Sequence, residues 1–186
     1  LKERNATMRK IEIPTSIIKL ILTLIGCTLA VALGFYLAKN PEYFISFKFR
    51  SPQFIRIVGI ITVCLFSLAW LYIIPKLFDR KPGLILDEKG ITDNSSFISV
   101  GLILWKDIVS IRTGKIKSNK FLIIDVCNPE KYVKGYGKVK TLLLKANIRL
   151  YGTPLSISSN GLKYNFKNLE KLIQTEFEKY KEKPNS

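Results

Sequence analysis

The sequence predicts an α+β protein: a two-helix transmembrane hairpin, followed by a small antiparallel β domain that a C-terminal helix closes. Two uncharged apolar runs, residues 20–38 and 57–74, are each long enough for a helix that crosses a bilayer core of about 30 Å. From Gly83 onward, short apolar runs alternate with turn residues, as in a chain of antiparallel strands. We therefore expect an N-terminal cytoplasmic segment at 1–16, the hairpin at 17–75 and the domain at 83–186.

Helix signals mark the ends of both apolar runs and predict helices at about 16–38 and 52–75. Pro14 to Ser16 offers capping groups before the first helix, and Ser51-Pro52 is a cap followed by proline at the first helical position. Pro75 should end or bend the second helix, because it lacks a backbone N–H. Aromatic residues near the ends suit the two membrane interfaces; they are Phe35, Tyr36, Trp70 and Tyr72.

The stretch LIGC at 24–27 allows two interpretations of Cys27. It has the pattern of a bacterial lipoprotein signal, in which Cys27 would carry the lipid. However, the apolar run continues for 11 residues beyond Cys27, which favours a retained transmembrane helix. In that helix, small residues permit close packing with another helix or another copy of the chain; they are Gly26, Cys27, Ala30, Ala32 and Gly34.

Basic residues predict the orientation of the hairpin in a cell membrane. Eight of them flank its two outer ends, and four lie in or beside the connecting loop. The positive-inside rule therefore predicts a multi-pass protein with both termini in the cytoplasm. The outer set is Lys2, Arg4, Arg9, Lys10, Lys19, Lys76, Arg80 and Lys81, and the loop set is Lys39, Lys48, Arg50 and Arg56.

The pattern of the C-terminal domain begins with a β-hairpin and ends with a helix. A turn at Glu88 to Gly90 joins the first two strands, and Asp107 is expected to cap a corner between Trp105 and Ile108, both facing the core. Further strands are predicted at 99–105, 108–113, 121–126 and around 155–158. Asn165 can cap a C-terminal helix, whose apolar face is Phe166, Leu169, Leu172, Ile173, Phe177 and Tyr180.

Three stretches, PGLILDEKGITDNSS (82–96), GLILWKDIVSIR (101–112) and YGTPLSISSN (151–160), follow the hairpin. With it they resemble an uncharacterised family of small bacterial membrane proteins whose soluble part is similar to pleckstrin-homology (PH) domains. The resemblance implies a PH-like binding or scaffolding module, although fold alone does not fix function. Phosphoinositide-binding PH domains carry a basic cluster at the first hairpin, whereas this chain has Asp87-Glu88-Lys89. Recognition of that kind is therefore not expected.

Residue types disfavour an enzyme. The chain contains no histidine, which removes the commonest general base and most zinc or haem sites, and its three cysteines are far apart. No nucleophile elbow, carboxylate pair or metal-ligand spacing is present, and GYGK at 135–138 lacks the spacing of a phosphate-binding loop. We expect no catalytic residue, no metal and no cofactor; Asp107 as a general acid is the weaker alternative.

The excess of positive charge predicts the partner. The net charge is +16, and residues 83–186 carry 18 Lys and Arg against 10 Asp and Glu. A tether of about seven residues, at most ~25 Å long, keeps the domain beside the bilayer, so anionic lipid rather than nucleic acid is the expected counter-charge.

Residues 138–152 carry the candidate contact with lipid. On a helix, Lys138, Lys145 and Arg149 flank one apolar face, as in an interfacial helix. The alternative is a helix packed on the sheet with solvated lysines; Leu144 and Ile148 lie on the opposite side and need cover in either case. The apolar face consists of Val139, Leu142, Leu143, Ala146 and Leu150.

Two functions follow from these patterns. The first is a membrane protein that presents a non-catalytic PH-like domain to lipid or to an unknown protein partner at the cytoplasmic face. The second is an immunity or accessory protein whose hairpin binds a partner inside the bilayer. They differ in whether the domain or the hairpin retrieves the partner.

Overall fold

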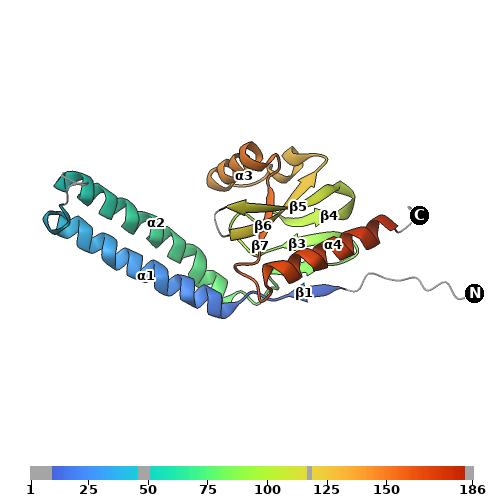
Figure 1. The fold of residues 1–186 in the computed structure, drawn as a ribbon, viewed down its shortest axis with the longest axis horizontal. Helices are drawn as coiled ribbons and strands as arrows, with labels where there is room; N and C mark the ends of the chain where they lie inside the picture. The colour runs from blue at the N-terminus through green and yellow to red at the C-terminus, as the bar shows by residue number, and fades with distance from the viewer. Residues whose placement is uncertain (1–9, 46–50, 117–118, 183–186) are drawn as a thin grey trace, which may run out of the picture. The chain divides into compact units, whose positions relative to one another are not determined.

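The computed structural model describes residues 10–45, 51–116 and 119–182 and divides the chain into two units. One unit is the helical segment 17–80, and the other joins 1–16 to 81–186. The elements follow one another along the chain as coloured in Figure 1. Five of the basic residues counted for orientation lie outside the described residues; they are Lys2, Arg4, Arg9, Lys48 and Arg50.

The helical unit is a pair of long helices, α1 (Ile17–Lys39) and α2 (Pro52–Phe78), with a short 3-10 turn η1 (Pro41–Phe44) between them. Both are long and apolar enough to cross a membrane. The predicted cap at Ser51 is confirmed, since its side chain accepts the Phe54 N–H at 3.5 Å. Pro75 does not end the second helix: α2 continues three residues beyond it, and Asp79 is its C-cap.

The two helices meet along a narrow stripe that includes two glycines. A Cβ on Gly59 would lie 2.6 Å from the carbonyl oxygen of Gly34, so only glycine allows this approach. Cys27 is 6% exposed and lies on the same stripe of α1, as predicted for a packing position. Gly26 is different, because a Cβ there would meet no atom within 4 Å. The outward faces remain apolar, with Ile18 73% exposed in α1.

The β unit contains two antiparallel sheets. The four-stranded sheet has the order β1 (Ile11–Ile13), β2 (Leu84–Leu86), β3 (Gly90–Asp93), β4 (Gly101–Leu104). The three-stranded sheet has the order β5 (Ile108–Ile116), β6 (Asn119–Val126), β7 (Leu155–Ser158). Gly90 is required where β3 approaches β4, because a Cβ would lie 1.9 Å from the Ile103 carbonyl oxygen.

Strand β1 precedes α1 by only three residues, and the sequence patterns did not predict it. Ile11 pairs with Leu86 and Ile13 with Leu84, so residues from before and after the helical pair share one sheet. The chain then stays attached to the domain up to Ser16, whose N–H donates to the Gly161 carbonyl at 2.9 Å. The segment before α1 is therefore bonded to the loop between β7 and the last helix.

One hydrophobic core joins both sheets to the C-terminal helix α4 (Phe166–Glu182). Trp105 is 1% exposed, its ring stacks on Phe177 at 6.2 Å, and its indole N–H donates to the Asp87 carbonyl at 2.8 Å. Asn165 caps α4 as predicted, since its side chain accepts the Asn168 N–H at 2.8 Å. The remaining helix, α3 (Lys138–Tyr151), lies at the edge of the domain opposite α4 in Figure 1.

Candidate functional site: the outer face of helix α3

Helix α3 turns its most apolar face away from the domain. Leu142 and Leu150 are each 69% exposed and Val139 is 65% exposed, and Ala146 is exposed between them. Leu143 is 40% exposed at the edge of this face. We call this surface, Val139, Leu142, Leu143, Ala146 and Leu150, the outer apolar face. Apolar side chains grouped in this way on a surface mark a contact with a partner or a membrane.

The opposite side of α3 packs on the domain. Leu144 is fully buried, Ile148 is half-buried beside it, and the helix contacts β7. The two residues that needed cover have therefore received it from the sheet. The helix therefore packs on the domain, as in the alternative interpretation. It does so through the side that carries Leu144 and Ile148, and not through the outer apolar face.

The predicted basic residues Lys138, Lys145 and Arg149 are all exposed on α3. At about 100° per residue they fall within about 40° of one another around the helix axis, on one flank of the outer apolar face. Among the described residues, none of the three forms an ion pair with an acidic side chain. We call these three residues the basic flank.

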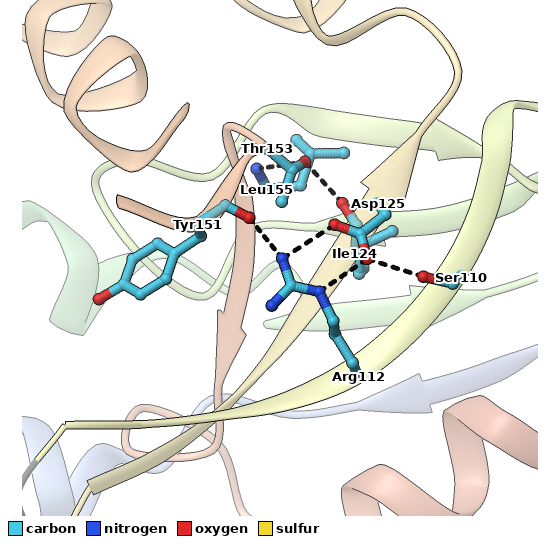
Figure 2. A network of polar contacts seen from close by, with 7 residues as sticks. All are labelled: Ser110, Arg112, Ile124, Asp125, Tyr151, Thr153 and Leu155. Carbon is cyan, nitrogen blue, oxygen red and sulfur yellow. Dashed lines mark hydrogen bonds and ion pairs between the residues drawn. The ribbon is translucent and has the colours of Figure 1, made fainter. Parts of the chain in front are cut away.

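Arg112 holds the C-terminal end of α3 against the sheet, as Figure 2 shows. Its guanidinium donates to the Tyr151 carbonyl in the last turn and to Asp125, with Nε 2.8 Å and Nη2 3.2 Å from the two carboxylate oxygens. Ser110 donates to the same carboxylate at 2.7 Å. Burial by itself would raise the pKa of Asp125, but these hydrogen bonds outweigh it and lower the pKa. A charged link therefore fixes the helix end, together with the packing of the Tyr151 ring against Phe121 at 5.3 Å.

The N-terminal half of α3 is attached to the loop between β3 and β4. Lys140 donates to the Ser99 carbonyl, and its ammonium lies 4.0 Å from the ring centroid of Tyr136. The Tyr136 hydroxyl donates to the Val100 carbonyl at 2.8 Å. Burial lowers the pKa of Lys140, so this lysine differs from the basic flank: it serves the internal attachment of the helix.

A buried carboxylate at the end of β3 holds the same loop. Asp93 is 3% exposed and accepts the Ser99 hydroxyl at 2.6 Å and the Ser95 N–H at 2.9 Å. Burial raises the pKa of Asp93. Since Ser99 also offers its carbonyl to Lys140, the Asp93 cluster fixes the loop on which the first turns of α3 rest.

Asp107 does not cap the corner with its side chain, contrary to the sequence prediction. The carboxylate instead accepts the Tyr132 hydroxyl at 2.7 Å and the Lys131 ammonium at 2.5 Å, both from a turn more than twenty residues later. The bond from Lys131 lowers the pKa of Asp107, with the Tyr132 bond adding to the effect. The Asp107 carboxylate therefore links two loops. The sequence prediction missed this link because Lys131 and Tyr132 are distant from Asp107 in the sequence.

Sequence patterns found the surface of α3 but not its attachments. Ser110 and Arg112 do show a signal, because residues two apart on a strand share a face. Their partner Asp125 becomes recognisable only from the register of β5 and β6, which places it opposite Ser110. The described residues contain no cluster of three or more His, Cys, Asp or Glu side chains arranged to hold a metal ion.

Comparison with known proteins identifies no relative: no protein-family model, no curated protein and no solved structure matches this chain.

Proposed function

We propose that this chain is a two-pass integral membrane protein that presents a non-catalytic, PH-like binding or scaffolding domain at the cytoplasmic face of the cell membrane. The observation that carries the proposal is the pairing of β1 with β2. These strands flank the two apolar helices, so both ends of the hairpin must reach the same sheet. A chain with two spans satisfies this requirement, because it returns to the side from which it started.

The exposed apolar surface of α1 and α2 supports the membrane-spanning part of the proposal. Only 11% of the most apolar window of each helix is buried within the structure, whereas a core helix of a soluble protein would be mostly buried. Three threonine hydroxyls on these helices are satisfied within the helix, which suits a bilayer: Thr23, Thr28 and Thr62 donate to carbonyls four residues earlier at 2.8, 2.9 and 2.8 Å.

The order of the domain elements supports the PH-like part of the proposal. Two antiparallel sheets of consecutive strands are followed by one C-terminal helix that packs its apolar face on their shared core. The hairpin would then be an insertion between the first two strands, and α3 an insertion between the last two. The polar clusters described above each tie one element to another, which fits a binding module better than an enzyme.

Topology is tested by labelling with a membrane-impermeant maleimide. Cys127 is native, free and exposed in the domain, and Glu42→Cys adds a thiol in η1 between the helices. With Cys27 and Cys64 replaced by alanine, Cys127 should label only in inside-out vesicles and the thiol at position 42 only in right-side-out vesicles. The proposal fails if both thiols label from the same side, or if alkaline carbonate extracts the chain from membranes.

A second candidate, binding of a partner by the hairpin, is favoured by the outward position of Gly26. A small residue on the exposed side of α1 allows another helix to approach closely. Gly26→Leu would then abolish capture of a partner that still binds when the outer apolar face of α3 is altered. The reverse result assigns binding to the domain.

A further inference from the structure

We propose that α3 is an interfacial helix that docks on the anionic leaflet of the membrane in which the hairpin is anchored. The outer apolar face enters the region between headgroups and acyl chains, and the basic flank binds lipid phosphates. This inference rests on the proposed function, because the domain must first be held at a membrane.

Charge and apolar surface are combined on α3 in the way an anionic interface requires. The helix contains no Asp or Glu, and the basic flank lies beside the outer apolar face rather than opposite it. Long basic side chains can then reach phosphates while their methylene groups cover the edge of the apolar surface. Helices with these two adjoining surfaces lie in the plane of a bilayer interface.

The attachment of α3 leaves this face free for docking. Arg112 and Lys140 hold the two ends of the helix from the domain side, and Leu144 fills the contact with the sheet. Docking therefore needs no rearrangement of the domain core, and the helix is already formed when it meets the lipid. Pre-formed binding surfaces avoid the entropic cost of folding on contact.

The short connections keep the leaflet within reach. The β unit is joined directly to both ends of the helical segment: its N-terminal part ends at Ser16, just before Ile17, and its main part begins at Lys81, just after Arg80. A unit of this size has a radius of gyration of about 13 Å, so every part of it lies within a few tens of ångströms of the hairpin ends. The effective concentration of lipid around α3 is consequently high, and even weak docking would be populated.

A second copy of the chain fits the same face less well. A stable protein interface buries roughly 800 Å² on each partner. The outer half of a 14-residue helix, about 21 Å long and 10–12 Å across, supplies only roughly 400 Å². Two such faces packed together would also bring two unpaired basic flanks close to each other. Anionic lipid removes this repulsion, whereas a second copy creates it.

The test uses the full chain in single-copy nanodiscs, with the native cysteines replaced and an environment-sensitive fluorophore on Leu142→Cys. Emission should shift to the blue in discs of phosphatidylcholine with phosphatidylglycerol, and far less in phosphatidylcholine alone. The same fluorophore on Gln174→Cys, an exposed position on α4, should not shift. Raising the salt concentration should reverse the shift, because salt screens the attraction.

The triple variant K138Q/K145Q/R149Q should lower the ratio of docked to undocked α3 by on the order of 100-fold, since each cation contributes about a fivefold factor at an anionic surface. The matched control K89Q/K106Q/K171Q removes three exposed cations from other elements and should leave docking unchanged. In a W70F background without the fluorophore, unchanged Trp105 emission verifies that both variants are folded.

Three results would overturn the inference: emission at position 142 that does not depend on lipid charge, a triple variant that behaves as its control, or a shift that occurs only when a disc holds two copies. If the chain remains an integral membrane protein while position 142 stays in water, only the docking of α3 is refuted. A chain that leaves the membrane refutes the proposed function itself.

Discussion

Replacing Ile13 with alanine tests whether the strand before α1 belongs to the domain core. Ile13 is fully buried and lies opposite Leu84 in the sheet. The substitution removes three carbon atoms, worth about 0.8 kcal/mol each in transfer free energy. With the cavity left behind, we expect the free energy of unfolding of the domain to fall by about 3 kcal/mol. The control is E12A, at a half-exposed neighbouring position, which should change it far less.

The measurement follows from the distribution of tryptophan, since the chain has one in each unit: Trp70 in α2 and Trp105 in the domain core. In a W70F background, emission from Trp105 reports on the domain alone during urea unfolding of the full chain in detergent. With an m-value of about 1.5–2 kcal/mol/M, the I13A midpoint should fall by roughly 1.5–2 M. Equal midpoints for I13A and E12A would show that β1 contributes nothing to the fold, and would remove the main support for the topology.

Two further predictions concern the hairpin and the loops. G59L places a side chain against the Gly34 carbonyl and should destabilise the helical pair by about 1–3 kcal/mol in thermal unfolding followed by circular dichroism, whereas G26L should have little effect; equal effects would contradict the packing. D107N should cost about 1–2 kcal/mol at neutral pH, because Asp107 loses its charged bond to Lys131. The folded pKa of Asp107 lies below its ordinary value of 3.8, so the stabilisation by its carboxylate is fully present above pH 3.8 and is lost as the pH falls through the folded pKa. The difference in free energy of unfolding between wild type and D107N should therefore shrink in acid. A difference that stays constant with pH would refute the assignment.

Elements with a strong local pattern could be predicted from the sequence. The uncharged runs gave both long helices to within a few residues, and the alternation of apolar and turn residues located the strands from Leu84 to Ser158. Helix α2 ends at Phe78 rather than at about 75, because a proline near the end of a helix removes one hydrogen bond without forcing the chain to stop. Strand β1 was missed since three residues carry too little pattern; its partner lies more than seventy positions later.

Candidate site residues divide in the same way. The composition of 138–151 was sufficient to group Lys138, Lys145 and Arg149 on one flank of an apolar face, because helical periodicity is a local property. Which face meets the domain was not predictable, since it depends on the Arg112 and Lys140 links to groups on other elements. Those links exist only after β5, β6 and the loop after β3 have taken their places.

The sequence by itself determined that this chain has two helices able to cross a bilayer, a separate β domain closed by a helix, and a basic amphipathic helix within it. These features depend on the period of apolar residues, which any short stretch of chain carries. Only the tertiary structure decided that the segment before the hairpin completes the sheet after it, and that α3 packs through Leu144 and leaves its outer apolar face exposed. Both outcomes require contacts between residues far apart in the chain, and such contacts are chosen by the packing of the whole domain.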